Sequence, residues 1–361
     1  MQLDRIDIKG FKSINSLSLH LKPINILIGA NGAGKSNFIS VFKLLNELIK
    51  ENLQKYIQVE GGANSLAHFG VKVTHKIELT LGFGINTYHL SLLPTQNDIL
   101  LIDIERCTIH DKTKYTEPYH QYTTADRYET NLTRDSSGVA QFVRKCFQEW
   151  RVYHFHDTSS NSAVKRTTDI NDNLHLRPDG GNLAAFLYRL KVAEYDSYRN
   201  IRDTIRLIVP YFDDFLLRAN PVNPNTIKLE WYSKGSDYPF QVYHLSDGTL
   251  RFICLATLFL QPAHLMPSTI LIDEPELGLH PYAINLLASF IKSVSSIKQV
   301  IISTQSVSLI NHFSAEDIIV VNQKNRVSSF ERLSEERLSN WLEEYSLGEL
   351  WEKNVFGGRP E

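Results

Sequence analysis

The apolar residues of this chain follow two kinds of spacing near its N-terminus. Between residues 3 and 21, apolar and polar residues alternate, which predicts two strands. Ile24 to Ile28 form an almost continuous aliphatic run, as in a strand buried on both faces of a parallel sheet. From Phe38 to Ile49 the apolar residues recur at spacings of three and four, which predicts an amphipathic helix. A buried strand therefore leads into a helix across residues 29–37.

Similar patterns predict the elements that follow. Alternation predicts an antiparallel meander of strands at Val71 to Leu81, Thr87 to Leu92 and Ile99 to Ile104. Helical spacing predicts one helix from Val139 to Trp150, and one or two more between Leu183 and Ile208. After a turn-rich segment, a further strand is expected to carry Ile227, Leu229 and Trp231.

Residues 108–135 contain almost no aliphatic side chains, so we expect no core there and predict a solvated hairpin or loop. A nucleic-acid surface is the alternative, because tyrosines that stack on bases alternate with basic residues that pair with phosphates. The acidic residues between them cancel most of the positive field and favour the solvated hairpin. The residues concerned are Tyr115, Tyr119, Tyr122 and Tyr128, with Lys112, Lys114, Arg127 and Arg134.

The loop between the first buried strand and its helix matches the phosphate-binding pattern G-x-x-x-x-G-K-[ST]. Its glycines let backbone N–H groups surround phosphates at the helix N-terminus, where the helix dipole adds partial positive charge. Lys35 is expected to reach the β- and γ-phosphates of ATP, and the Ser36 hydroxyl to hold Mg²⁺. The predicted nucleotide-binding residues here are Gly29, Ala30, Asn31, Gly32, Ala33, Gly34, Lys35, Ser36 and Asn37.

A second apolar strand, from Thr269 to Ile272, ends in the acids Asp273 and Glu274. Asp273 is expected to bind Mg²⁺ through a water molecule, and Glu274 to polarise the attacking water as general base. Paired acids after a buried strand also occur as a helix cap, but the phosphate-binding loop in the same chain favours the catalytic interpretation.

Ser246, Asp247 and Gly248 precede the apolar run from Leu250 to Leu260, so they lie at a predicted helix N-terminus. Such a position binds a γ-phosphate through a hydroxyl, a backbone N–H and the helix dipole.

His154 and His156 form an H-x-H pair, which offers two imidazole ligands for a metal site. No third ligand can be identified, so ordinary hydrogen-bonded histidines are favoured.

Composition narrows the cellular setting. The chain has 361 residues, 42% of them hydrophobic, so length allows two domains or one domain with an insertion. A net charge of −2 and a pI near 6.7 restrict any nucleic-acid contact to a local patch. The cysteines are widely spaced, the N-terminus lacks the form of a signal peptide, and the longest apolar run is far too short to cross a bilayer. We therefore expect a cytoplasmic protein without membrane contact.

These motifs together resemble those of RecF-like and SMC-like ABC-type ATPases. Ser246-Asp247-Gly248 is similar to the ABC signature, Asp273-Glu274-Pro275 to the Walker B motif, and residues 276–280 to the D-loop. Residues 245–252 and 345–351 resemble a bacterial family of predicted AAA-type ATPases, and that similarity runs nearly end to end. The resemblance implies an α/β P-loop NTPase of the ABC-ATPase head type, with a mixed sheet, an antiparallel β lobe and a helical insertion.

The resemblance also implies a division of the chain and a dimer. We expect a first lobe of the head at residues 1–104, a polar hairpin and helical insertion at 105–224, and a second lobe at 225–361. In the family two heads enclose each ATP, so Ser246 and Gly248 are expected to act in trans in a homodimer. The switch position, which is usually a histidine in the family, is occupied by Gln305. Glutamine donates a hydrogen bond but carries no charge, so we expect slow ATP turnover. Gln54 and Gln58 are candidates for the Q-loop residue.

Three functions share these nucleotide motifs. The first is an ATP-driven clamp that acts on DNA in repair or anti-phage defence. The second is an ATP-gated scaffold that holds or releases a separately encoded effector nuclease or toxin. About 87 residues follow Glu274 and contain no Asp-x-Asp pair, so we expect no fused TOPRIM nuclease. A transporter engine ranks last, because about 210 residues separate Lys35 from Ser246 and the stretch from Ile6 to Ser13 resembles RecF.

Overall fold

The computed structural model describes residues 2–122 and 127–358, which form two compact units. The first unit comprises Met1–Trp150 and Ser314–Glu361, and the second comprises Arg151–Phe313. The phosphate-binding loop therefore belongs to the first unit, and the paired acids and the signature belong to the second. The boundaries of these units differ from the predicted ones at residues 104 and 224. The predicted segments are divided by the positions of the motifs, whereas the two units are defined by which residues pack together.

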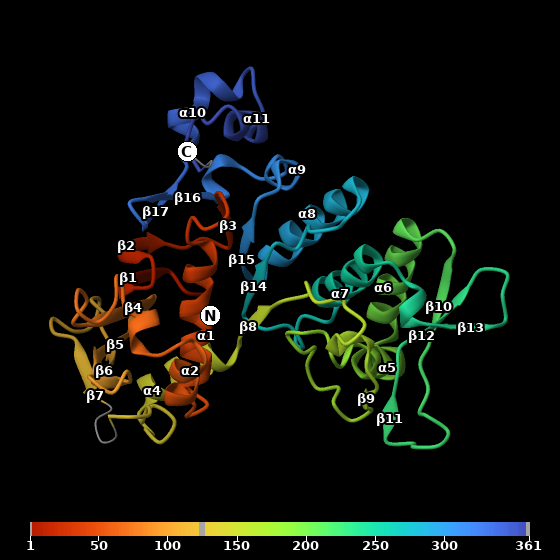
Figure 1. The fold of residues 1–361 in the computed structure, drawn as a ribbon, viewed down its shortest axis with the longest axis horizontal. Coiled ribbons are helices and arrows are strands. Elements are labelled where there is room, and N and C mark those ends of the chain that lie inside the picture. The colour runs from red at the N-terminus through yellow and green to blue at the C-terminus, as the bar shows by residue number, and fades with distance from the viewer. Residues whose placement is uncertain (1, 123–126, 359–361) are drawn as a thin grey trace. The chain divides into compact units, whose positions relative to one another are not determined.

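An antiparallel sheet in the order β2-β1-β4-β5-β6-β7 forms a large part of the first unit (Figure 1). Along β4, Ile77, Leu79, Leu81 and Phe83 are buried and the residues between them are partly exposed. One face of the sheet therefore packs on the core and the other faces water. The strands are β1 (Arg5–Phe11), β2 (Ile14–His20), β4 (Ile77–Phe83), β5 (Asn86–Pro94), β6 (Leu100–Ile109) and β7 (Tyr119–Tyr122).

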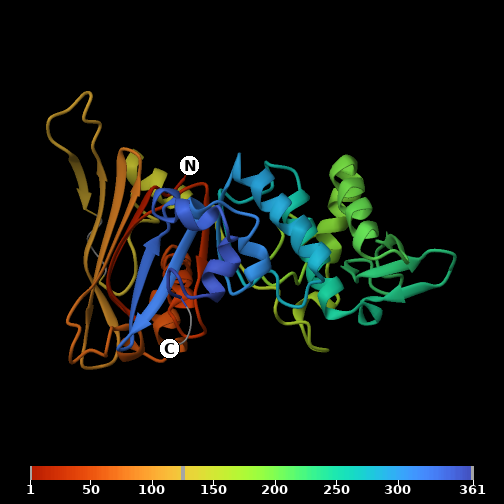
Figure 2. The same ribbon diagram turned by 90° about the horizontal axis from the view of Figure 1, so that it is seen from above.

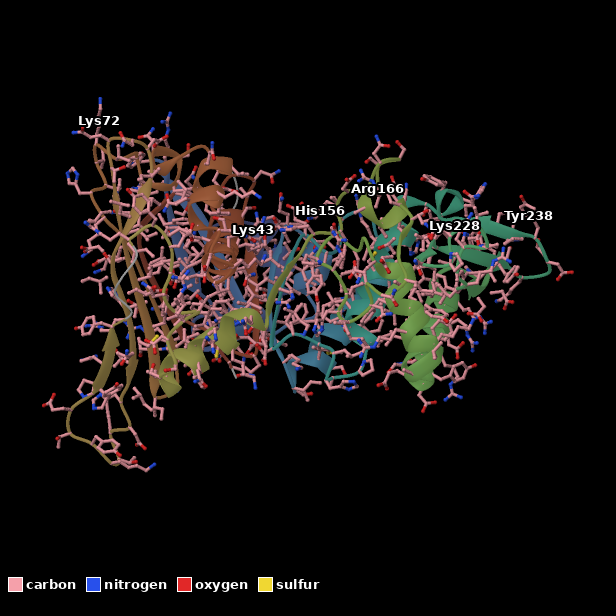
Figure 3. All side chains as sticks on the ribbon, turned by 90° about the horizontal axis from the view of Figure 1, so that it is seen from below. Lys43, Lys72, His156, Arg166, Lys228 and Tyr238 are labelled. Atoms are coloured by element: carbon pink, nitrogen blue, oxygen red, sulfur yellow. The ribbon has the colours of Figure 1, made fainter. Side chains whose placement is uncertain are left out.

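The strand predicted from Val71 is wrong in its first half. Gly70 has a φ of 81°, and its carbonyl accepts hydrogen bonds from the N–H groups of Val73 and Thr74 in a turn. Val73 is 61% exposed, and Lys72 projects from the same turn into solvent (Figure 3). The β-branched residues here imitate a strand, but they have no buried face, so β4 begins at Ile77.

The polar segment 108–135 contains the end of β6 and all of β7, which pair as a hairpin. Its loop extends beyond the neighbouring strands, and Tyr115, Tyr119, Tyr122 and Tyr128 are exposed (Figure 2). This agrees with a solvated hairpin, although residues 123–126 of the predicted segment lie outside the described residues. The expectation that the segment adds nothing to a core is wrong at Leu132, which is fully buried.

Buried polar contacts explain this exception. The carboxylate of Glu105 in β6 is buried and accepts hydrogen bonds from the Thr130 hydroxyl (2.6 Å) and the Tyr88 hydroxyl (2.7 Å). The Thr130 hydroxyl also accepts a hydrogen bond from the Leu132 N–H (2.9 Å), so the buried Glu105 fixes the chain just before Leu132.

The phosphate-binding loop joins β3 (Ile24–Ile28) to α1 (Lys35–Leu48), as predicted. β3 pairs in parallel with β16 (Ile318–Lys324), and β16 pairs antiparallel with β17 (Val327–Arg332), so this is a mixed arrangement. The remaining helical elements of this unit are α2 (Leu53–Val59), α3 (Ala63–Leu66), α4 (Gly138–Gln148), the 3₁₀ helix η3 (Ala315–Asp317), α10 (Glu335–Leu342) and α11 (Leu347–Glu352).

The helix predicted to run to Trp150 ends earlier, at Gln148. Trp150 begins β8 (Trp150–Tyr153) and packs on Phe42 and Phe147, with ring centroids 5.1 Å and 4.8 Å apart. The spacing of apolar residues predicts that Trp150 lies on the apolar face of the helix. In the structure its side chain packs in the same core, but it belongs to the strand that follows the helix.

In the second unit, β14 (Thr269–Asp273) pairs in parallel with β15 (Gln299–Thr304), and both are buried along most of their length. The helical stretch predicted from Leu183 to Ile208 forms as two helices, α5 (Leu183–Ala193) and α6 (Tyr195–Ile208). The other helices and 3₁₀ turns are η1 (Ala163–Lys165), η2 (Val242–His244), α7 (Asp247–Leu260), α8 (Pro281–Ser295) and α9 (Val307–Ile310).

The single strand predicted through Ile227, Leu229 and Trp231 is wrong. Ile227 ends β11 (Thr226–Ile227), which pairs with β9 (Thr168–Asp169), whereas Trp231 lies in β12 (Glu230–Ser233). β12 pairs with β10 (Phe212–Leu216) and β13 (Pro239–Gln241) in a different sheet, so the alternating pattern spans two strands. Tyr238 projects from the loop between β12 and β13 (Figure 3). No helix within residues 2–122 and 127–358 is long and apolar enough to cross a membrane.

Candidate nucleotide-binding site

Two positions of the phosphate-binding loop require glycine. A Cβ on Gly29 would lie 2.3 Å from the Val321 carbonyl oxygen, and one on Gly34 would lie 2.1 Å from Ser328 Oγ. Gly34 also has a φ of 116° at the N-cap of α1, a conformation that L-residues rarely adopt. The predicted glycines are therefore required by the close approach of β16 and β17 residues and by the turn itself.

Lys35 places a positive charge directly on this loop. Its side chain is buried, and Nζ donates hydrogen bonds to the carbonyl oxygens of Gly29 (2.6 Å) and Ala30 (3.0 Å). The next residue, Ser36, is exposed in the first turn of α1. A helix N-terminus with an exposed serine beside a held ammonium group is suited to an anion such as a triphosphate.

Two serines that the sequence did not suggest as site residues support the loop from behind. The Ser328 hydroxyl of β17 donates to the Ala33 carbonyl (2.5 Å) and lies 2.7 Å from the Ser13 hydroxyl. Ser13 also accepts a hydrogen bond from the Asn37 side-chain amide (2.7 Å). These contacts join the turn after β1, the first turn of α1 and β17. Gln323 of β16 adds a bond from its side-chain amide to the Gly32 carbonyl (2.9 Å).

In the second unit, the chain turns sharply where β14 ends. Asp273 is the last residue of the strand, and Glu274 has a φ of 42°, in the left-handed region. The Glu274 N–H donates to the Ser303 carbonyl of β15 (2.7 Å). The side-chain amide of Gln305, just past β15, donates to the Glu274 carboxylate. The structure thus brings the predicted base and the predicted switch residue together.

Glu276 is a further acid at this turn, which the sequence indicated only as part of the D-loop. Its Oε1 accepts hydrogen bonds from the Thr304 hydroxyl (2.5 Å) and the Gln305 N–H (3.3 Å). Burial raises the pKa of Glu276 above its ordinary value, and the charge of Glu274 raises it further. Three residues beyond Asp273, a second carboxyl therefore contacts Thr304 and Gln305, which together we call the switch loop after the predicted role of Gln305.

The signature residues lie at an exposed helix N-terminus, as predicted. Ser246 caps α7, since its Oγ accepts a hydrogen bond from the Thr249 N–H (3.2 Å). Asp247 is exposed and forms an ion pair with Lys165 at 3.4 Å. A Cβ on Gly248 would lie 2.3 Å from the Gly278 carbonyl oxygen, so a glycine is needed where α7 meets the D-loop.

His154 and His156 do not lie in a strand, because β8 ends at Tyr153. The imidazole ring centroids of His154 and His156 are 6.4 Å apart. Within the described part of the chain, no group of three His, Cys, Asp or Glu side chains is arranged to hold a metal ion. The segment instead contacts α7, since Arg251 donates to the carbonyl oxygens of Phe155 (3.2 Å) and His156 (2.8 Å).

Each unit carries groups that fit Mg²⁺-ATP in chemical terms. The loop offers backbone N–H groups, a lysine ammonium and an exposed serine hydroxyl, and β14 ends in a carboxylate of the kind that Mg²⁺ prefers. When bound, Mg²⁺ neutralises phosphate charge.

Three comparisons describe what this chain resembles. A family model described as "AAA domain, putative AbiEii toxin, Type IV TA system" matches residues 24–311. The "Old nuclease" of Escherichia phage P2 is 25% identical, over 89% of this chain and 59% of the nuclease. The "Uncharacterized protein YbjD" of Escherichia coli (strain K12) is 49% identical over 45 residues, 12% of this chain and 8% of that protein. The chain thus spans less than two thirds of either relative.

The fold resembles that of SMC head domains. An Smc head bound to the C-winged helix domain of ScpA has a TM-score of 0.57, at 17% identity over 93% of this chain and 99% of that chain. An Smc head with an extended coiled coil, bound to the C-terminal domain of ScpA from Pyrococcus furiosus, has a TM-score of 0.55, at 15% identity over 95% and 98%. The ABC-type head fold expected from the motifs is confirmed.

Proposed function

Since the chain belongs to the family described as "AAA domain, putative AbiEii toxin, Type IV TA system", we propose that it binds ATP with Mg²⁺ and hydrolyses the nucleotide slowly. Residues 29–37 bind the phosphates through backbone N–H groups and the Lys35 ammonium. The Ser36 hydroxyl would hold Mg²⁺ directly, Asp273 would act on Mg²⁺ through a water molecule, and Glu274 would take the proton of the attacking water.

The observation that carries this proposal is the hydrogen bond from the Gln305 amide to the Glu274 carboxylate. A general base needs a fixed orientation toward the water that it activates. Gln305 supplies that orientation but, unlike the usual histidine, cannot carry a positive charge. Positioning without charge stabilisation is consistent with slow turnover rather than with none.

We further propose that ATP holds two copies of the chain together. The N-terminus of α7 is exposed, with the Ser246 hydroxyl and the backbone of Gly248 at its start. These are groups that bind a γ-phosphate presented by a second copy. The expected result is an ATP-dependent dimer, visible by sedimentation in a variant that binds ATP but hydrolyses it slowly.

For the physiological role, we propose action on DNA in repair or anti-phage defence. Support comes from the relative named as a nuclease and from the β6–β7 hairpin. Its exposed tyrosines offer stacking surfaces, and the Arg106 guanidinium lies 5.7 Å from the centre of the Tyr122 ring. The second candidate is an ATP-gated scaffold for a separate effector nuclease or toxin, which the description of the family favours.

Steady-state ATP turnover, with and without double- and single-stranded DNA at low and high salt, tests these functions. Glu274→Gln serves as the blank. Stimulation by DNA that falls with salt supports the DNA-acting clamp, because phosphate contacts release counterions. A low rate that no DNA changes favours the effector scaffold. Turnover no higher than that of the blank would reject the ATPase itself.

A further inference from the structure

The end of β15 is tied to the end of β14 by more than the regular strand pairing. The Glu274 N–H donates to Ser303, and beyond it Glu276 accepts hydrogen bonds from Thr304 and from the backbone of Gln305. The Thr304 hydroxyl also accepts a hydrogen bond from the Ser306 N–H (2.9 Å). A single carboxylate oxygen therefore fixes the two residues at which the chain leaves the strand.

Gln305 is held from two sides at this point. Its backbone N–H donates to Glu276, and its side-chain amide donates to Glu274. If the first contact is lost, the backbone of Gln305 loses one of the hydrogen bonds that fix it, and its side-chain amide is held less firmly beside the base. The Thr304 hydroxyl loses its acceptor at the same time.

From this geometry we propose that Glu276 is a positioning residue for ATP hydrolysis, which holds Gln305 so that its amide orients the Glu274 carboxylate. The inference rests on the proposed function, since it concerns the reaction that Glu274 and Gln305 perform. Glu276 itself acts through the switch loop and touches neither nucleotide nor water in this role.

The second oxygen of Glu276 indicates which substitution preserves this role. Oε2 is buried and has no hydrogen-bond partner in the described part of the chain. A buried oxygen without a partner favours the neutral acid, in agreement with the raised pKa of the group. Glutamine is neutral, has the same shape and keeps the accepting oxygen, so Glu276→Gln should retain the contacts to Thr304 and Gln305.

Turnover kinetics provide the first test. In Glu276→Ala we expect kcat to fall by about 10- to 100-fold, the scale of a misplaced reacting group, with the KM for ATP unchanged. Glu276→Gln should recover most of that loss. In a Gln305→Ala background, Glu276→Ala should have little further effect, because both act through one amide. Glu344→Ala, which alters an exposed glutamate of the first unit, is the matched control.

Hydrogen exchange of a peptide that covers residues 299–306 provides a test that needs no turnover. We expect faster exchange at its C-terminal end in Glu276→Ala and wild-type exchange in Glu276→Gln. Unchanged exchange in Glu276→Ala overturns the inference, as does a kcat within a factor of two of wild type. If exchange changes as expected but the wild type hydrolyses no more ATP than Glu274→Gln, the proposed ATPase fails while the role of Glu276 in holding Gln305 stands.

Discussion

The substitution Glu274→Gln keeps the shape of the predicted base and removes its ability to take a proton. Gln305 donates its amide to Glu274, and a glutamine at position 274 keeps a side-chain oxygen that accepts this bond. The backbone, with a φ of 42°, meets the same strain for either residue. What the substitution removes is the negative charge and the ability to take a proton.

The size of the effect follows from the neighbours of Glu274. General-base catalysis contributes about 10²- to 10⁴-fold, which corresponds to about 2.7–5.4 kcal/mol of transition-state stabilisation. Gln305 cannot take a proton in place of the base. Glu276 is a poor substitute, because its Oε1 already accepts two hydrogen bonds and burial favours its neutral form. We therefore expect a loss of kcat in the upper half of this range.

Phosphate release under steady-state conditions measures the loss, and titration calorimetry with ATP measures binding. ATP affinity should stay within a few-fold of wild type, since the phosphate-binding loop is unchanged. Glu344→Gln, at an exposed glutamate, controls for the substitution itself. If Glu274→Gln released phosphate at the wild-type rate, the assignment of Glu274 as base would be wrong.

Three other predictions concern Lys35, Gly34 and Cys254. Lys35→Ala removes the ammonium held over the loop, so calorimetry should detect no ATP binding, and the loss of two hydrogen bonds should lower the thermal midpoint while circular dichroism shows a folded protein. Gly34→Ala forces a Cβ against Ser328 at a positive φ and should cost about 2–5 kcal/mol of unfolding free energy, seen as a lower urea midpoint. Burial raises the pKa of Cys254 to about 12, so its thiol should resist alkylation at pH 8. Because the unfolded thiol ionises near pH 9, the stability from this group should fall as pH rises from 9 toward 12.

Local signals in the sequence predicted the elements around the site well. β3 runs from Ile24 to Ile28 as expected, because a continuous aliphatic run followed by glycine is a local property of the chain. α7 begins after Ser246, which caps the helix as its position before an apolar run indicated. Local patterns failed where they lacked a burial context, as at Val73, whose β-branched side chain lies in an exposed turn.

The residues that support the site depend on contacts that no local pattern contains. Ser13 and Ser328 are 315 residues apart, yet their hydroxyls meet behind the phosphate-binding loop. Small polar residues such as these are common on protein surfaces, so neither stands out in the sequence. Glu276 belongs to a recognisable D-loop, but its contact with Thr304 depends on β14 and β15 being neighbours. Such roles become visible only when the fold is known.

The D-loop connects the signature to the switch within the second unit. Gly248 of α7 packs against the carbonyl of Gly278, and Arg251 of the same helix donates to the Leu277 carbonyl (2.8 Å). Leu277 directly follows Glu276, which holds Gln305 through its backbone. If a phosphate binds at the N-terminus of α7, as we propose, it acts on a helix that is packed against the same short turn. Because a close-packed turn moves as a whole rather than residue by residue, we expect engagement of the signature to change the orientation of Gln305 and with it that of the base.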